Sequence, residues 1–183
     1  MNSLAPSFLL SMPQLGDPNF RQAVVLLCLH GEEGAFGLIV NRPAKTRGRI
    51  LVTLDPPVTT ERHLEIWLGG PVEPERSLML VGSGQGEAAA DSLRVTDGLH
   101  LSRSPELLRR VVEPNPPPDV RLMVGYAGWG RGQLENELES SFWLVSDVDP
   151  DLIFKTPADQ MWERAIRRLG ADPAALQVSR GVH

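Results

Sequence analysis

The chain contains one unbroken apolar run that ends on a polar residue, Ala23-Val24-Val25-Leu26-Leu27-Cys28-Leu29-His30. A run of this kind, without alternating polar residues, is typical of a strand that is buried on both faces. A short turn, Gly31-Glu32-Glu33-Gly34, leads into a second apolar run, Phe36-Gly37-Leu38-Ile39-Val40-Asn41, which Pro43 ends. Two such runs joined by a few residues that include glycine predict a hairpin at the centre of a sheet.

The segments on either side of this hairpin predict more strands than helices. Strands are expected over 7–12, 65–68, 77–81, 93–95, 98–101, 120–124, 142–145 and 152–154, and 49–54 is either a strand or a short helix. Helices are expected from Ser104-Pro105, over 133–139, and last from Thr156-Pro157, with Asp159 at the capping-box position. Because the strands and helices do not alternate regularly, the pattern favours the α+β class over a doubly wound parallel sheet.

The last of these helices has a clear apolar stripe. Residues at i, i+3, i+4 and i+7 are predicted to be buried, and a glycine follows where a C-terminal cap belongs. These residues are Trp162, Ala165, Ile166, Leu169 and Gly170. The tail after Asp172 is expected to be peripheral, so residues 1–183 are predicted to form one domain.

Composition excludes several classes of protein. The chain has 183 residues, of which 42% are apolar, so it can build a core and is not a disordered chain. Its 18 basic and 23 acidic residues give a net charge of −5, which speaks against direct nucleic-acid binding. The single cysteine, Cys28, excludes an intrachain disulfide and a cysteine-based zinc cluster. The histidines are scattered, and no metal or other cofactor is expected.

The first residues of the given sequence are expected to form neither a charged leader nor a membrane span. Its apolar run is short, lies between Pro6 and Pro13, and has no lysine or arginine before it. We therefore expect a cytoplasmic protein with no membrane contact.

A glycine–aromatic segment, Gly125-Tyr126-Ala127-Gly128-Trp129-Gly130-Arg131-Gly132, is predicted to be a loop that runs into the helix over 133–139. Four glycines permit positive φ and close backbone approach, and the helix N-terminus favours an anion. Arg131 can add a donor fork. The segment lacks a P-loop lysine and the dinucleotide glycine spacing. A strained turn with core aromatics and a site that binds a ligand are therefore equally good interpretations.

Two side chains on the following helix share one face. Gln133 and Glu137 lie four residues apart, so they can hydrogen-bond a ligand, fix the loop, or form a solvated pair.

His30 is the candidate for a general base. It closes the buried strand, where its side chain is either a scaffold group or reaches a cleft. Cys28 is two residues away, at a backbone separation of roughly 7 Å, and an apolar setting raises a thiol pKa. We therefore interpret Cys28 as a core residue.

Two more polar or glycine-rich segments complete the candidate site. Asn41-Arg42-Pro43 ends the second strand of the hairpin, and Gly69-Gly70-Pro71 can pass close to a backbone or a ligand or be a plain turn. The candidate pocket residues are His30, Asn41, Arg42, Gly70, Tyr126, Trp129, Gln133 and Glu137.

In these segments the chain resembles the YqgE/AlgH family of bacterial proteins. The resemblance is carried by Phe20, His30, Gly34-Ala35, Gly37, Asn41-Arg42-Pro43, Gly69-Gly70-Pro71-Val72, Gly125-Tyr126-Ala127-Gly128-Trp129, Gln133-Leu134-Glu135, Glu137-Leu138, Trp143, Phe154 and Trp162. It implies an α+β fold with a mixed, branched sheet curled into a pseudo-barrel and flanked by helices. It supplies no catalytic residues, and it implies a regulatory role in transcription for one branch.

Three functions follow from these observations. The first is a binding or regulatory module whose pocket near Gly125–Gly132 takes a small anion or a protein partner. The second is a hydrolase or transferase that uses His30 as its base, which requires a cleft beside the imidazole. The third is a transcriptional regulator, although the sequence contains neither a helix-turn-helix pattern nor a basic excess. The residues favour binding over catalysis.

Overall fold

A computed structural model describes residues 2–44, 50–52, 58–60, 65–85 and 92–178. Its strands are β1 (Ser7–Ser11), β2 (Val24–Gly31), β3 (Gly34–Ile39), β4 (Ile50–Val52), β5 (Val58–Thr60), β6 (Ile66–Leu68), β7 (Val72–Gly82), β8 (Leu93–Thr96), β9 (Leu99–Ser102), β10 (Val120–Gly130) and β11 (Trp143–Ser146). Its helices are α1 (Pro105–Val112), α2 (Gln133–Glu139), α3 (Pro150–Lys155), α4 (Ala158–Arg168) and α5 (Pro173–Val178). Short 3₁₀ turns cover Pro13–Leu15, Pro18–Phe20 and Ser83–Gln85.

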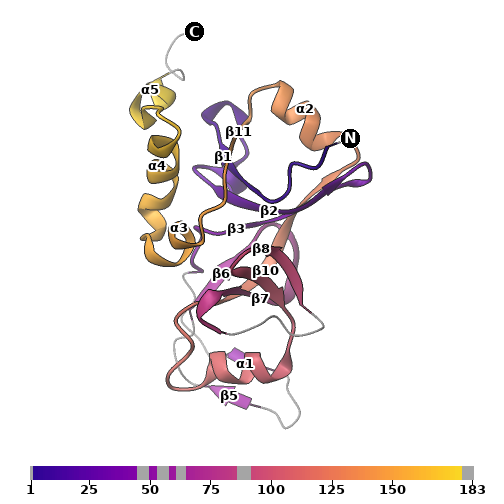
Figure 1. Ribbon diagram of the computed structural model, residues 1–183, viewed down its shortest axis with the longest axis vertical. Helices are drawn as coiled ribbons and strands as arrows, with labels where there is room; N and C mark the ends of the chain where they lie inside the picture. Colours follow the sequence, from indigo (N-terminus) through magenta and orange to yellow (C-terminus); the bar gives the residue numbers. More distant parts are fainter. Residues whose placement is uncertain (1, 45–49, 53–57, 61–64, 86–91, 179–183) are drawn as a thin grey trace.

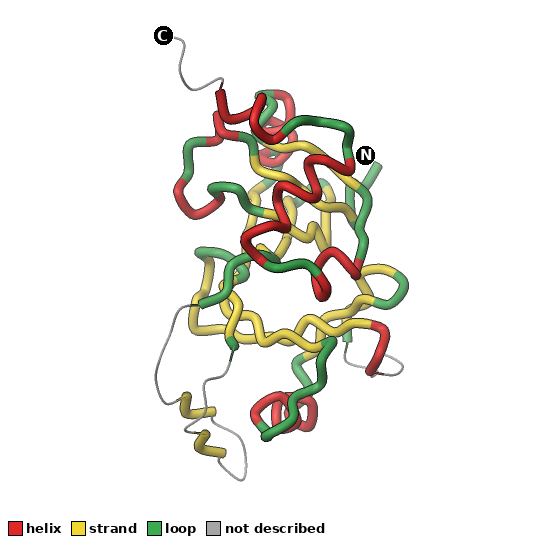
Figure 2. The backbone as a smooth tube through the Cα atoms, turned by 90° about the vertical axis from the view of Figure 1, so that its left-hand side faces the viewer, coloured by secondary structure: helices red, strands yellow, loops and turns green. Residues whose placement is uncertain are grey.

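A nine-stranded sheet forms the middle of the molecule, in the order β11-β1-β2-β3-β10-β7-β9-β8, with β6 branching from β10 (Figure 1). The β6–β10 pair is parallel and the other pairs of this sheet are antiparallel. The helices lie outside the strands instead of alternating with them (Figure 2), so the α+β class is confirmed. The path of described strands ends at β11 and β8 without closing, and the pseudo-barrel therefore stays a prediction.

The predicted hairpin is confirmed as β2 and β3. Val24 to Leu27 are fully buried, as expected for a strand that is covered on both faces. The register between the two strands shifts between Leu27 and Leu29, and Leu29 is exposed on the far side of this bulge. The strand alternative for 49–54 is also confirmed, because Ile50–Val52 forms β4.

The strand β10 joins the two halves of the sheet. Its second half pairs with β3, from Ala127 opposite Gly37 to Gly130 opposite Gly34. Its first half pairs with β7 and β6 instead. The partners change around Gly125, whose φ is 70° and where the register to β7 shifts.

The glycine–aromatic segment is therefore mostly strand, and its prediction as a loop was wrong. Its glycines allow two backbones to cross. A Cβ on Gly70 would lie 2.2 Å from the backbone oxygen of Tyr126, and one on Gly125 would lie 2.3 Å from the oxygen of Gly70. Gly69 also donates to the Val124 carbonyl over 2.8 Å. Of the interpretations left open for Gly70, close approach to another backbone is the one observed.

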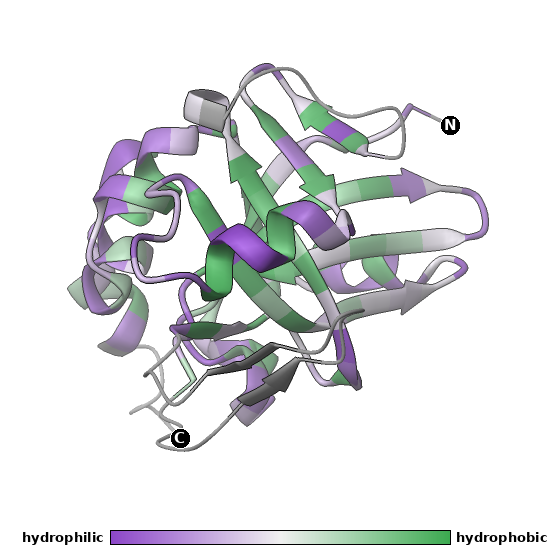
Figure 3. Ribbon diagram, turned by 90° about the horizontal axis from the view of Figure 1, so that it is seen from below, coloured by the Kyte–Doolittle hydropathy of each residue, from purple (hydrophilic) through white to green (hydrophobic). Residues whose placement is uncertain are grey.

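Three apolar clusters hold the helices to the sheet. The largest cluster packs α3 and α4 against the sheet and includes Phe8, Leu26, Met123, Ile153 and Trp162. A second lies under α2, and a smaller one joins α1 to β7 and β10. Figure 3 shows apolar strands in the middle of the molecule, with polar segments mostly on the helices and hairpin ends.

Three expectations for the C-terminal third were wrong. Residues 152–154 are helical in α3, because the Asp149 carboxylate caps the Asp151 N–H at 2.9 Å and starts a helix. Helix α4 starts without a side-chain cap, so Thr156 and Asp159 form no capping box. Leu169 is 43% exposed at the end of the stripe. Apart from these three, the chain beyond Asp172 forms a further helix, α5, whose Leu176 packs against the largest cluster. That this tail is peripheral stays a prediction.

Candidate functional site

The side chains near α2 are bonded to one another. Glu137 Oε2 accepts hydrogen bonds from Trp129 Nε1 at 2.9 Å and Trp143 Nε1 at 2.7 Å. Its other oxygen accepts from Gln133 Nε2 at 3.0 Å, and Gln133 Oε1 accepts from the Gly130 N–H at 3.1 Å. The Phe20 ring packs edge-on against Trp143, with 5.5 Å between centroids. Gln133 and Glu137 therefore fix α2 to the sheet.

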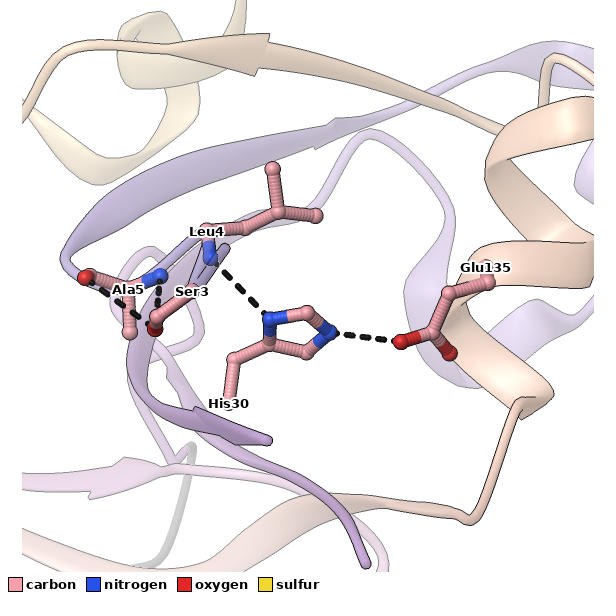
Figure 4. Close-up of polar contacts among 5 residues, drawn as sticks. All are labelled: Ser3, Leu4, Ala5, His30 and Glu135. Atoms are coloured by element: carbon pink, nitrogen blue, oxygen red, sulfur yellow. Dashed lines mark hydrogen bonds and ion pairs between the residues drawn. The ribbon is translucent and has the colours of Figure 1, made fainter. Parts of the chain in front are cut away.

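His30 is also held inside the protein (Figure 4). Nδ1 accepts a hydrogen bond from the Leu4 N–H at 3.0 Å, and Nε2 lies 2.7 Å from Glu135 Oε1. An acceptor at Nδ1 places the ring proton on Nε2, which donates to Glu135. The helix backbone N–H and, after it, His30 hold the pKa of Glu135 below its usual value.

The geometry of His30 does not meet the requirement for a general base. Its side chain is 2% exposed, and both ring nitrogens already have partners. His30 lines none of the four cavities described below. Cys28 is no alternative nucleophile, because burial raises the pKa of its thiol to about 12.

Asn41 and Arg42 lie at the other end of the hairpin. Asn41 Oδ1 accepts from the Val24 N–H, and Nδ2 donates to the Gln22 carbonyl, both at 2.9 Å. Arg42 donates to the Arg21 carbonyl, and burial together with the Arg21 charge lowers the Arg42 pKa. Both residues line a cavity of about 550 Å³ against α4, beside Trp162.

The structure divides the eight predicted site residues among several places. Trp129, Gln133 and Glu137 are joined under α2, and His30 reaches the same helix through Glu135. Tyr126 packs on Phe36 with 5.0 Å between ring centroids, and its backbone crosses Gly70. Asn41 and Arg42 stand at the opposite end of β3 from His30. None of the four described cavities is lined by all eight residues.

Beside α2 there is an open hollow of about 310 Å³. It is lined by Arg131, Gln133, Asn136, Glu137, Ser140 and Phe142. Another hollow, of about 360 Å³, lies between the first 3₁₀ turns and Trp162.

The largest described cavity has a volume of about 880 Å³ and lies beside the connection between α3 and α4. We call it the Arg121 cavity. Its walls include Pro43, Glu65, Trp67, Arg121, Phe154 and the proline segment from Pro114 to Pro118. None of the predicted pocket residues lines it, although Pro43 belongs to the Asn41-Arg42-Pro43 motif.

Among the side chains of this cavity, Arg121 is the one whose chemistry suggests that a ligand binds here. Its guanidinium stacks on Trp67, 3.7 Å from the ring centroid, and lies 5.5 Å from the centroid of Phe154. Nη1 donates to the Val40 carbonyl at 3.0 Å, the one hydrogen bond of this side chain among the described residues. Burial lowers the pKa of Arg121 to about 10, and the nearby Glu65 opposes this shift. The group stays charged at neutral pH, with several N–H donors left for a ligand.

The sequence does contain a signal that singles out Arg121. In the strand 120–124, Val120, Leu122 and Val124 face one way and Met123 the other. Arg121 shares the face of Met123, which is fully buried. An arginine on the buried face of a strand needs partners, and here two aromatic rings supply them.

None of the described helices is long and apolar enough to cross a membrane. Within the described part of the chain, no group of three or more histidine, cysteine, aspartate or glutamate side chains could hold a metal ion.

Comparison with known proteins places the whole chain in one group. The AlgH-like family model matches residues 8–174. A UPF0301 protein of Ruegeria pomeroyi is 40% identical over 181 residues, covering 97% of this chain and 98% of the relative. A UPF0301 protein of Burkholderia mallei is 36% identical over 182 residues, covering 98% and 95%.

Two solved structures are also similar. The solution structure of the AlgH protein from Pseudomonas aeruginosa has a TM-score of 0.75 and 33% identity, and the match covers 100% of this chain and 98% of that one. The crystal structure of a Corynebacterium diphtheriae protein, DIP2367, has a TM-score of 0.68 and 21% identity, with coverage of 97% and 92%. The second match concerns the fold alone.

Proposed function

This chain belongs to the AlgH-like family, and we propose that it is a binding module that takes a small anionic ligand on Arg121. One observation carries the proposal: a half-buried guanidinium, stacked on Trp67, lines the largest described cavity. Binding pockets typically combine apolar walls with a few directed polar groups, in volumes of about 300–1,000 Å³. The Arg121 cavity has a volume in this range, and its walls combine proline, aliphatic and aromatic side chains with polar and charged ones.

The physical basis of binding is a positive charge that has no direct ion pair among the described residues. Outside bulk water, a charge-assisted hydrogen bond between a guanidinium and an anion is stronger than a neutral one. Lys155, also on the cavity wall, is already paired with Asp151 at 3.1 Å. Arg121 has no ion pair within 4 Å among the described residues, so a ligand anion can bind it without displacing a protein carboxylate.

A ligand-responsive module of this kind fits a cytoplasmic regulatory protein that acts through a small molecule or a protein partner. The net charge of −5 supports a route without direct contact to nucleic acid. A regulatory role in transcription would then be indirect. The described cavities do not favour a hydrolase or transferase, because His30 lines none of them.

The hollow beside α2 is the second place where an anion could bind, as the glycine–aromatic segment suggested. Arg131 lines it, but Gln133 and Glu137 on its wall are bonded to each other. Arg131 is therefore a matched control for Arg121.

A thermal-shift screen of carboxylates, phosphates and nucleotides tests the proposal with wild type, Arg121→Gln and Arg131→Gln. A ligand at a hundred times its Kd stabilises by about 2.7 kcal/mol, which raises Tm by about 5–10 °C in a protein of this size. We expect this shift in wild type and Arg131→Gln but not in Arg121→Gln. Loss of the shift in Arg131→Gln alone would move the site to α2. No stabilisation by any anion would refute the proposal.

A further inference from the structure

We infer, building on the proposed function, that the ligand of the Arg121 cavity is a monocarboxylate with an apolar body. The carboxylate would pair with the edge of the Arg121 guanidinium, and the body would lie along the proline and aromatic walls. This class includes free apolar carboxylic acids and the C-terminal carboxylate of an apolar peptide.

The geometry of Arg121 favours an oxyanion that accepts two hydrogen bonds at once. The guanidinium lies over Trp67, 3.7 Å from the ring centroid, and its N–H groups point outward in its own plane. Two parallel N–H···O bonds from this edge match a carboxylate or a phosphate, and the choice between them comes from the walls and charges of the cavity. The bond from Nη1 to the Val40 carbonyl fixes the plane in which the ligand would lie.

One part of the wall favours an apolar body. The cavity also has polar and charged lining residues, but this part consists of Val111, Val120, Leu122, Phe154 and several prolines. Proline has no backbone N–H, so this wall offers few donors to a polar ligand. A cavity of about 880 Å³ is also far larger than a carboxylate group alone requires.

The charges favour a single negative group on the ligand. Glu65 and Glu113 line the same cavity as Arg121, and Glu65 is close enough to raise the Arg121 pKa. A second anionic group on the ligand would be repelled by the Glu65 carboxylate, and Lys155, the other cation on the wall, is already paired with Asp151. Polyphosphates, nucleotides and dicarboxylates are therefore disfavoured.

Titration calorimetry with defined probes tests this inference. The probes are acetate, hexanoate and decanoate below its micelle concentration, decanol as the neutral analogue, and succinate and inorganic phosphate as the other anions. We expect Kd to fall about threefold to fourfold for each methylene that enters the cavity. Decanoate should bind at least tenfold more tightly than decanol, and this preference should vanish in Arg121→Gln.

Glu65→Gln is the decisive second variant, because Glu65 is exposed and its replacement leaves the core unchanged. Removing the competing carboxylate should tighten decanoate binding about threefold while decanol is unaffected. The result keeps the test valid even if Arg121→Gln folds poorly. Unchanged or weaker binding to Glu65→Gln would overturn the inference.

The remaining outcomes separate the ligand class from the site. Binding of phosphate or succinate through Arg121, without a gain from hexanoate to decanoate, would overturn the ligand class and leave the anion site intact. Probe binding that is the same in wild type and folded Arg121→Gln would overturn both. An apolar tripeptide that binds with a free but not an amidated C-terminus, more tightly than decanoate, would identify a peptide end as the carboxylate source.

Discussion

On α2, the Glu137 carboxylate accepts hydrogen bonds from two tryptophans and a glutamine, whereas Arg121 on β10 keeps most of its N–H donors without a described partner. Both groups are polar, both lie beside aromatic rings, and both belong to strands or helices that pack on the sheet. They differ in how far the protein itself satisfies them.

This difference distinguishes polar groups that stabilise the fold from polar groups that can bind a ligand. A buried polar group whose hydrogen bonds are complete stabilises one packing arrangement and offers nothing to a ligand. A partly buried charge whose N–H donors have no protein partner can form favourable electrostatic interactions with a ligand anion. Substitutions in the hydrogen-bond network of α2 should therefore lower the stability of the protein. Substitutions in the Arg121 cavity should instead change its affinity for the ligand.

The largest expected effect comes from Gly70→Ala, at the backbone crossing. Its Cβ would overlap the Tyr126 backbone at 2.2 Å, so one of the two segments must move. We expect a loss of at least about 4 kcal/mol of unfolding free energy, measured by urea denaturation, or no folded protein. Gly130→Ala is the control, because its Cβ would meet nothing closer than 4.0 Å and should change stability by less than about 0.5 kcal/mol. Equal behaviour of the two variants would contradict the crossing.

Glu137→Ala should have the next largest effect. It leaves the Trp129 and Trp143 indole N–H groups without their acceptor, which costs about 3 kcal/mol in total and lowers Tm by about 6–12 °C. Decanoate affinity at the Arg121 cavity should stay the same. Glu139→Gln, on an exposed position of the same helix, controls for a change of charge. A Tm within about 2 °C of wild type would show that the α2 network is dispensable.

Arg121→Gln should give the opposite combination. It removes the stacking on Trp67 and the bond to the Val40 carbonyl, but it also removes a partly buried charge. We expect a net loss of about 1 kcal/mol in stability and the loss of anion binding. Urea denaturation and calorimetry on the same preparation check both. If Arg121→Gln lost as much stability as Glu137→Ala and still bound the anion, the contrast between the two regions would be contradicted.

The smallest effect is the pH dependence of the His30–Glu135 pair. The folded pKa of Glu135 is lowered, so its charge stabilises the protein above the unfolded pKa of about 4.3, and this contribution is lost as pH falls through the folded value. Since Glu135 is about a third exposed, Glu135→Gln should lose only about 0.5 kcal/mol at pH 7, and the difference from wild type should vanish in acid. A difference that is constant from pH 7 to pH 3 would show that the charge is irrelevant.

The sequence predicted the central hairpin because apolar patterning is a local signal that needs no partner to be recognised. Val24 to Leu27 are buried for the reason their pattern indicated, and Cys28 is an inert core thiol. The helix cap at Ser104 was likewise predictable, because its hydroxyl accepts from Leu107 only three residues away. The Asp149-Pro150 cap gave the same kind of local signal and was missed in favour of a short apolar strand.

The loop prediction failed because glycine permits both a turn and a close crossing, and the sequence does not say which backbone lies opposite. Only the folded chain brings Gly69–Gly70 over Gly125–Tyr126. His30 was similarly ambiguous, since a polar strand end can face a cleft or a scaffold. Its partners, Leu4 and Glu135, come from the start of the chain and from α2.

Local patterns thus determined the α+β class, the buried strands and the helices α1, α2 and α4, since these depend on residues within one or two turns or strand repeats of each other. The tertiary structure decided which polar groups are satisfied. The donors to Glu137 come from residues within eight positions along the chain, but they reach it only because β10, α2 and β11 pack together. The partners of Arg121, Val40 and Trp67, come from distant segments, and they leave most of its N–H donors without a described partner.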